Sequence, residues 1–453
     1  MTTINSQPSP DGIFSILDTD LYKLTMQCAV LKYFPDVNVS YKFTNRTPHM
    51  PLNRAAFNWL QKQVERLGNI RVTDEEISWL GKTCPYLSEE YLDYLKGYRW
   101  KPKEQIKLTF TPKAGTTESD SQPGETDIQI HGLWVETIQF EIPLLALVSE
   151  AYFKFVNTDW NYDGQVEKAK HKGSQLLEAG CAFSEFGSRR RRDYKTHEMV
   201  MEGLIAAQKE AASKGSPGKF AGTSNVHFAM KYAVNPVGTV AHEWFMGIAA
   251  LTGDYAGANE KALQYWTGAF GRGTLSIALT DTFGTPAFLK AFARPAPKSN
   301  TLDTQVDWQD PSYAQIFTGT RQDSGDPLDF IQMMRTFYDS QNIKDPKTIV
   351  FSDSLNVDKC IKYKNATEAA GLTPSFGVGT FFTNDFWHLS NNEKSVPLNI
   401  VIKLSDAKGV PAVKLSDDIG KNMGPGSLVE KVKDQLGYTD KSWKEGDEAH
   451  RWD

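Results

Sequence analysis

His242 and Glu243 stand next to each other where the apolar run of "GTVA" meets "HEW". An imidazole in this place is either a hydrogen-bonded core residue or a nucleophile and proton carrier that faces a cleft. The run before it has the composition of a buried strand, so we expect both side chains at the end of a strand.

Two further clusters carry charges suited to anions and sugars. Arg189 follows the apolar run in "CAFSEFGSRRRRD", and a guanidinium fork matches phosphate or carboxylate. Arg191 and Arg192 are expected on a solvated basic face. In "RQDSGD", Arg321 and Asp323 are two residues apart, so an extended backbone would aim both the same way. One would hold an anion while the other accepts hydrogen bonds from sugar hydroxyls.

The last clusters favour phosphate. Gly379 and Thr380 in "FGVGT" offer bare backbone amides and a hydroxyl donor. Ser352 and Asp353 in "FSDSLN" come just before a predicted helix, whose N-terminal dipole favours an anion. Together these clusters predict a site for a phosphorylated sugar with several anionic groups, although glycine, serine and aspartate are also ordinary turn residues.

Seven short apolar runs after residue 180 carry these residues, and most alternate with segments of helical pattern. The alternation predicts βα units with a largely parallel sheet that closes into a barrel-like ring. In that architecture the carboxyl ends of the strands share one face, where the active site forms. The runs are "CAFSE", "FAGT", "VGTVA", "TLSIALT", "IFTGT", "TIVF" and "SFGVG".

The N-terminal region predicts a different arrangement. A helix follows Asp18 or Thr19 as its N-cap, "NVSYKFTNR" alternates like a strand, and residues 73–80 and 88–97 have helical patterning. Residues 113–127 are polar and are expected to form a mobile loop in a hairpin. We predict an α+β domain over 1–175, the α/β barrel over 176–385, and a segment over 386–453 that returns to the smaller domain.

Bulk properties exclude several classes. The formal charge is −5 over 453 residues, which gives no reason to expect a nucleic-acid or membrane partner. Four scattered cysteines form no CxxC pair, so neither a zinc ribbon nor a disulfide scaffold is expected. Residues 1–12 are polar and are interpreted as a loose leader. No run of apolar residues is long enough to cross a bilayer, and we expect an intracellular protein.

Eight motifs in one order connect the chain to a known family. They resemble the nicotinate phosphoribosyltransferases, a group of type II phosphoribosyltransferases with an incomplete α/β barrel and a smaller domain, and the resemblance runs from about residue 16 to residue 426. The motifs are "DTDLYKLTMQ", "EFGSRRRRD", "GTSN", "GTVAHEW", "DTFGT", "RQDSGDP", "FSDSLN" and "GVGTFFTND".

The resemblance implies a reaction and its participants. Nicotinate, 5-phosphoribosyl-1-diphosphate and ATP would give nicotinate mononucleotide, diphosphate, ADP and phosphate, the entry step of NAD salvage. Mg²⁺ would bind mainly through the diphosphate rather than in a dedicated protein site. A homodimer is expected, because relatives often place the residue matching Tyr22 in a neighbouring subunit's site. The expected location is the cytoplasm, with sharing with the nucleus left open.

Roles carry over residue by residue. His242 resembles the histidine that ATP phosphorylates, with Glu243 and Asp281 as carboxylates that orient it or hold magnesium. The remaining matches are expected to bind substrates. Tyr22 and Phe186 would sandwich the pyridine, Thr239 would belong to the nicotinate site, and Arg321 and Arg189 would lie near the pyridine and diphosphate. Asp323 would take the ribose hydroxyls, and Gly379 and Thr380 would hold the 5′-phosphate, with Ser352 and Asp353 nearby.

Four alternatives remain open at this point. A nicotinamide-using transferase shares the barrel and the phosphohistidine, whereas a quinolinate enzyme needs neither ATP nor that histidine. A catalytically silent metabolite sensor would keep the fold without the activity. An unrelated sugar-phosphate barrel enzyme would leave "DTDLYKLTMQ" to chance.

Overall fold

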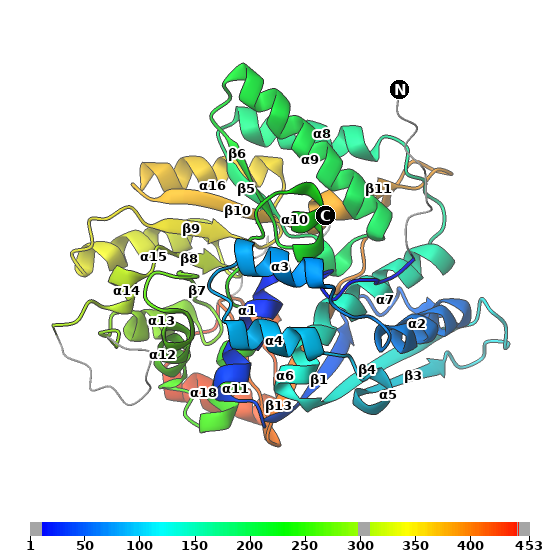
Figure 1. Cartoon of the computed structure of the whole chain (residues 1–453), viewed down its shortest axis with the longest axis horizontal. Helices are drawn as coiled ribbons and strands as arrows, with labels where there is room; N and C mark the ends of the chain where they lie inside the picture. Colours follow the sequence, from blue (N-terminus) through cyan, green and yellow to red (C-terminus); the bar gives the residue numbers. More distant parts are fainter. Residues whose placement is uncertain (1–10, 298–308, 442, 444–453) are drawn as a thin grey trace.

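The computed structural model describes residues 11–297, 309–441 and 443. Its strands form two large sheets and one two-stranded ribbon. Figure 1 shows the parallel sheet with its helices in the upper left part of the molecule and the antiparallel sheet at the lower right. No helix among the described residues is long and apolar enough to span a bilayer. The leader over 1–12 falls almost wholly outside the described residues.

The parallel sheet confirms the predicted α/β class. Its order is β6–β5–β10–β9–β8–β7, and every neighbouring pair is parallel. Six of the seven predicted runs form its strands: β5 (Ala182–Glu185), β6 (Lys219–Thr223), β7 (Ile277–Leu279), β8 (Gly319–Gln322), β9 (Thr348–Phe351) and β10 (Thr373–Val378). Strands β6 and β7 are its edges, so within the described ranges the sheet is open.

The seventh run is not a strand, and that prediction is wrong. Residues 237–241 belong to no strand, although Pro236 forms an isolated bridge with Thr223 and Val237 N–H donates to the Thr223 carbonyl, and helix α11 (His242–Thr252) begins directly after them. The helix is buried from His242 through Ala250, because it packs against β13 and helix α12. An apolar run that continues into a fully buried helix has no polar face to reveal its period.

The second sheet joins the two ends of the chain. Its order is β14–β13–β1–β4–β2, with β3 paired to β4. Antiparallel pairing of β1 with β13 places a strand from the C-terminal part of the chain beside one from the N-terminal part. The strands are β1 (Asn38–Asn45), β2 (Leu52–Asn53), β3 (Ile106–Pro112), β4 (Pro123–Leu133), β13 (Ile400–Ala407) and β14 (Val410–Pro411), and the separate ribbon is β11 (Phe386–Trp387) with β12 (Lys394–Ser395).

Helices surround both sheets (Figure 1). Those of the N-terminal region are α1 (Leu21–Tyr33), α2 (Arg54–Leu67), α3 (Asp74–Thr83), α4 (Glu89–Gly97), α5 (Pro102–Gln105), α6 (Trp134–Thr137) and α7 (Glu141–Phe155). Those that follow are α8 (Gln165–Glu178), α9 (Tyr194–Lys214), α10 (Val226–Tyr232), α11, α12 (Ala258–Phe270), α13 (Thr285–Phe292), α14 (Tyr313–Ile316), α15 (Pro327–Ser340), α16 (Val357–Ala369), α17 (Thr380–Thr383) and α18 (Gly426–Leu436).

Local signals explain several boundaries. Thr73 caps α3 with a complete capping box, and Ser88 caps α4, as the helical patterning over 73–80 and 88–97 predicted. Two predictions need correction. Helix α1 begins after Asp20, not after Asp18 or Thr19, because Asp18 is engaged by Arg191 instead. The hairpin loop covers only residues 113–122, because Pro123 already pairs in β4.

Candidate active site

A cavity of about 270 Å³ lies where the carboxyl ends of the parallel strands face the antiparallel sheet. Ten residues predicted from the sequence line it: Tyr22, Phe186, Arg189, His242, Arg321, Asp323, Ser352, Asp353, Gly379 and Thr380. The predicted common mouth of the strand ends is therefore present, although His242 reaches it from the start of a helix.

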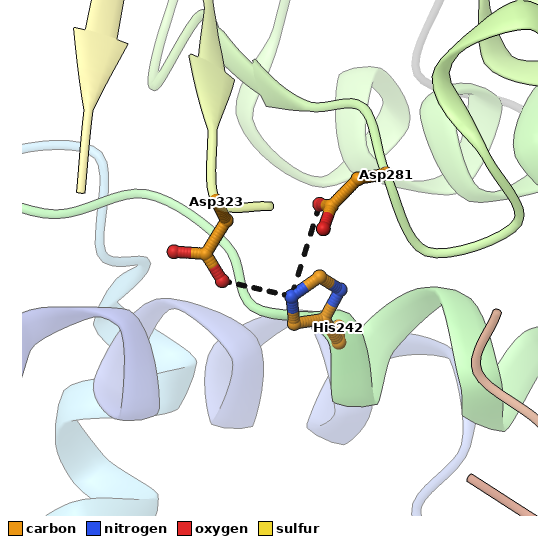
Figure 2. A group of neighbouring side chains, drawn as sticks. All are labelled: His242, Asp281 and Asp323. Atoms are coloured by element: carbon orange, nitrogen blue, oxygen red, sulfur yellow. Dashed lines mark hydrogen bonds and ion pairs between the residues drawn. The ribbon is translucent and has the colours of Figure 1, made fainter. Parts of the chain in front are cut away.

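His242 is held on both sides of its ring. Nε2 lies 2.9 Å from Asp323 Oδ2 and 3.8 Å from Asp281 Oδ1, and Nδ1 lies 3.0 Å from the Thr282 hydroxyl. Figure 2 shows both carboxylates pointing at the same ring nitrogen. Asp323 lines the cavity whereas Thr282 is buried behind it, so Nε2 is the nitrogen on the cavity side.

The environment keeps this ring neutral. Burial lowers the pKa of His242 to about 4, and the charge of Lys414 acts in the same direction against the two aspartates. Burial alone would raise the pKa of Asp323, but the hydrogen bond from His242 and the charge of Arg321 hold that pKa well below its usual range. At neutral pH the site therefore combines an uncharged imidazole, the form in which a histidine can act as a nucleophile, with an ionised carboxylate.

Asp281 stands just behind the cavity wall and does not line it. Its Oδ2 accepts a hydrogen bond of 2.5 Å from the Ser324 hydroxyl, while its buried Oδ1, on the His242 side, has no hydrogen-bond partner. A buried carboxylate oxygen without a partner is costly and marks a place where a cation or proton is expected. The carryover to Asp281 of an orienting or metal-holding role fits this geometry.

Glu243 points away from His242, so the expectation that it orients the imidazole is wrong. Successive residues at the start of a helix project about 100° apart, and this turn sends Glu243 into the interior. There its carboxylate lies 2.6 Å from the Lys23 ammonium and accepts hydrogen bonds from Tyr41 and Trp134. The residues that hold the imidazole are Asp323 and Thr282, and the adjacency of His242 and Glu243 in sequence did not indicate either.

Thr239 does not line the cavity. Its hydroxyl donates to the carbonyl of Ile277, and its own carbonyl accepts from the Thr25 hydroxyl. These bonds fasten residues 238–241 between β7 and α1. Gly238 makes this close approach feasible, because its φ is +152° and a Cβ there would lie 3.3 Å from the Tyr22 nitrogen. Thr239 therefore positions the segment before His242 rather than facing a ligand.

Strands β8 and β9 place the next group. Arg321 Nη1 donates to the carbonyl of Val240 over 3.0 Å, which ties the end of β8 to the segment before His242. The Ser352 hydroxyl donates to Asp323 Oδ1 over 2.7 Å, so both oxygens of Asp323 are engaged. Asp353 forms an ion pair with Lys421. The two-residue spacing of Arg321 and Asp323 does place both side chains on the cavity, as predicted.

The aromatic end of the cavity contains Tyr22, Phe186 and Arg189. Gly377 on β10 also lines it. A Cβ at that position would lie 2.3 Å from the Phe186 ring. The glycine in "FGVGT" nearest this ring thus makes room for an aromatic side chain. Tyr22 lines the cavity of its own chain.

Arg191 and Arg192 are buried, and the prediction of a solvated basic face is wrong. Arg191 forms a two-pronged ion pair with Asp18, with N–O distances of 2.8 and 2.7 Å. Arg192 packs its guanidinium against the rings of Phe153 and Phe386. Buried arginines persist only when paired or stacked, and each of these has such a partner.

Sequence reasoning missed the basic residues on the side of the antiparallel sheet. Lys403, Lys414 and Lys421 come from the C-terminal part of the chain and line the cavity, as do Arg46 and Lys394. Nine lysines and arginines face five aspartates and glutamates around this cavity, although the whole chain carries a net charge of −5. Such a concentration of positive charge attracts and holds polyanions.

Comparison with known proteins now decides the family. A model described as the nicotinate phosphoribosyltransferase (NAPRTase) family matches residues 181–440, and one for the N-terminal domain of that family matches residues 17–149. The chain belongs to the nicotinate phosphoribosyltransferase family.

Individual relatives agree over their full length. A probable nicotinate phosphoribosyltransferase of Schizosaccharomyces pombe is 49% identical over 94% of this chain and 98% of its own. The nicotinate phosphoribosyltransferase of Saccharomyces cerevisiae is 45% identical over 97% of this chain and 99% of its own. A crystal structure of a putative family member from that yeast has a TM-score of 0.87 at 44% identity, covering 96% of this chain and 100% of that one.

The oxygen donors beside His242 suit a magnesium ion that takes most of its ligands from bound substrates. Mg²⁺ prefers six oxygen ligands, and the carboxylates of Asp281 and Asp323 offer protein oxygens next to His242. The remaining ligands would have to be phosphate oxygens or water. Asp281, through its unpartnered Oδ1, and Asp323 are the residues that would contact the ion.

Proposed function

We propose that this chain forms nicotinate mononucleotide and diphosphate from nicotinate and 5-phosphoribosyl-1-diphosphate, and couples the transfer to hydrolysis of ATP through a phosphohistidine at His242. The observation that carries the proposal is a neutral, buried imidazole held by Asp323 and Thr282 at the wall of a strongly basic cavity. Membership of the family supplies the reaction class.

Nicotinate would occupy the aromatic end. A flat ring suits the space lined by Tyr22 and Phe186, and its carboxylate suits the Arg189 guanidinium. Arg321 would lie near the pyridine and the diphosphate. A carboxylate of Glu141 lies 3.9 Å from Arg189, which keeps the guanidinium over the cavity without saturating its donors.

The sugar diphosphate would lie across the rest of the cavity. Gly379 and Thr380 would hold the 5′-phosphate, with Ser352 and Asp353 beside them, and the lysines from the C-terminal part would face the diphosphate. Asp323 would take the ribose hydroxyls, for which it must exchange its bonds to His242 or Ser352. Ribosyl transfer through an oxocarbenium-like state needs positioned charges for the leaving diphosphate more than a protein nucleophile.

The His242 step requires a change of tautomer. With Nε2–H donating to Asp323, Nδ1 accepts from the Thr282 hydroxyl. Moving the ring proton to Nδ1, where it donates to Thr282, leaves a lone pair on Nε2 at the cavity side. Nε2 then bonds to the γ-phosphorus as the bond from that phosphorus to the bridging oxygen of ADP breaks, and water later hydrolyses the N–P bond to release phosphate.

Magnesium would supply charge neutralisation to the diphosphate and triphosphate chains when bound. The role of this chain is then to hold Asp281 and Asp323 within reach of those phosphates. The pKa of Lys414 is lowered by burial, and its ammonium would add a positive charge near His242 beside that of the magnesium ion.

We also propose the division predicted from the sequence: a barrel-like domain over 176–385, and a smaller domain of 1–175 with 386–453. The pairing of β1 with β13 supports the second part. A homodimer and a cytoplasmic location, with nuclear sharing open, stay predictions from the family resemblance.

One assay separates the proposal from its alternatives. Purified protein is given nicotinate, nicotinamide or quinolinate with 5-phosphoribosyl-1-diphosphate and Mg²⁺, with and without ATP, and the mononucleotide is measured. Nicotinate should be the preferred base, and ATP should stimulate its use. Preference for nicotinamide would favour the amide-using alternative, and binding without turnover of any base would favour a silent sensor.

A further inference from the structure

The side chain of Lys23 forms two buried ion pairs that link the helix of His242 to the helix of Tyr22. Its ammonium lies 2.6 Å from Glu243 Oε2 and 2.6 Å from Glu141 Oε2, and the lysine is completely buried. Glu243 follows His242 in the first turn of α11, and Lys23 follows Tyr22 in the first turn of α1. The pair therefore joins the two turns that present these side chains to the cavity.

The neighbours of this cluster extend toward the aromatic end. The Lys23 ammonium lies 5.7 Å from the centre of the Tyr22 ring, and Glu141 lies 3.9 Å from Arg189. Tyr41 and Trp134 donate to the other oxygen of Glu243 over 2.5 and 2.8 Å, so that carboxylate is fully engaged. The charges of Lys23, Lys403 and Arg189 overcome burial and lower the pKa of Glu141 to about 2, which keeps the cluster ionised.

We infer that Lys23 and Glu243 are positioning residues that couple the state of His242 to the binding of the pyridine at Tyr22 and Arg189. The inference rests on the proposed function. A phosphoryl group on Nε2 must displace Asp323 from that nitrogen and adds negative charge at the first turn of α11. Any resulting shift of that turn reaches α1 through the Glu243–Lys23 pair, because the two charged groups are in direct contact and buried.

Residues 238–241 are hydrogen-bonded to elements on both sides of them. Thr25 on α1 donates to the carbonyl of Thr239, and Arg321 donates to the carbonyl of Val240. The first of these bonds also brings the segment before His242 into contact with α1. The Glu243–Lys23 pair adds a charged contact between the first turns of α11 and α1.

The test measures the effect of ATP on the KM for nicotinate in Glu243→Gln, Lys23→Met and the double variant. ATP should lower that KM in the wild type, by a factor in the range of about 5–150 typical of coupled sites. Each single variant should lose most of this factor, and the double variant should lose no more than either one. Acid-labile phosphate on His242 should still form in Glu243→Gln.

Two further proteins keep the test interpretable. Lys347→Met neutralises another buried lysine, which donates only to the carbonyls of Gln315 and Phe317 and does not line the cavity, and it should keep the full ATP effect. Tyr41→Phe removes one hydrogen bond from Glu243 without removing a charge. It should therefore fold even if the charge-removing variants fail to fold, and it should reduce the ATP effect partly.

The outcomes separate the inference from the proposed function. An ATP effect on nicotinate KM that survives in Glu243→Gln and Tyr41→Phe would overturn the inference alone. Loss of the phosphohistidine in Glu243→Gln would also overturn it, because Glu243 would then act on the chemistry of His242. A wild type whose nicotinate use is indifferent to ATP would overturn the proposed function and the inference with it.

Discussion

The two sides of the cavity differ in origin and in charge. One side consists of the carboxyl ends of parallel strands with the start of α11, and it presents His242, Asp323, Phe186 and Gly379. The opposite side comes from the antiparallel sheet and the C-terminal part of the chain, and it presents Lys403, Lys414 and Lys421. The contrast indicates that the proposed histidine chemistry belongs to one fold unit, while the lysines that add positive charge come from another.

The largest expected effect concerns the basic side. Lys414→Met should raise the KM for 5-phosphoribosyl-1-diphosphate by about tenfold to a hundredfold, because hydrogen bonds to charged groups contribute about 1.5–3 kcal/mol. The KM for nicotinate should change much less. Steady-state kinetics with both substrates varied tests this, with Lys431→Met as the control, since Lys431 is exposed on α18 outside the cavity. Equal rises in both KM values would contradict the division of labour.

The aromatic end of the cavity, where Tyr22 of α1 faces the strand-end side, should show the opposite selectivity. Tyr22→Ala should raise the KM for nicotinate by about tenfold, because an aromatic contact and the area that it buries are lost. The KM for the sugar diphosphate should stay close to that of the wild type. Tyr22→Phe retains the ring and should behave nearly like the wild type, so a large defect in that variant would argue for a role of the hydroxyl instead of stacking.

The pH dependence should separate the two sides further. Burial lowers the pKa of Lys403 to about 7, although Glu141 opposes part of the shift. The ammonium is thus charged below that pH and neutral above it, so the affinity for the anionic sugar diphosphate should fall as the pH rises through 7. We expect its KM to increase about fivefold across two pH units around this pKa, since the charged fraction falls about tenfold there.

Lys403→Arg provides the comparison for this pH effect. Arginine keeps its charge throughout, so the same pH series should become flat for that variant. A wild-type profile that persists unchanged in Lys403→Arg would assign the titration to another group, such as the substrate phosphates.

The smallest expected effect concerns Gly377, which packs against the Phe186 ring. Gly377→Ala places a methyl group against that ring, and the overpacking should cost about 1–3 kcal/mol of unfolding free energy. The ring should tilt rather than leave, so the KM for nicotinate should rise only about twofold to threefold. Thermal unfolding and nicotinate kinetics measured together check this; an unchanged melting temperature would mean that the ring has an alternative position.

The strand-end side was predictable because its signal is local. Arg321 and Asp323 stand two apart at the end of an apolar run, and such runs in βα order converge on one edge. The start of α11 was misread because "TVAHEWFMGIAAL" is apolar almost throughout, and periodicity cannot distinguish a buried helix from a buried strand. Glu243 was misassigned for the same reason, since its direction depends on that helix.

The basic side could not be predicted in the same way. Lys403 faces the cavity because β13 pairs with β1, a contact between distant parts of the chain that no local pattern encodes. Arg191 shows the converse case, because a run of four arginines predicts exposure and only the buried Asp18 reveals otherwise. The composition and spacing of a sequence do not predict the position of charged residues that long-range pairing buries.

The central claim is that His242, at the boundary between the two sides, receives the γ-phosphoryl group of ATP. Its most direct test is incubation of the wild type and of His242→Ala with radiolabelled ATP and Mg²⁺, followed by mapping of acid-labile phosphate by mass spectrometry. The account predicts label on His242 in the wild type and none in the variant, which should keep only ATP-independent transfer. ATP-stimulated transfer without label on His242, or label retained in the variant, would contradict it.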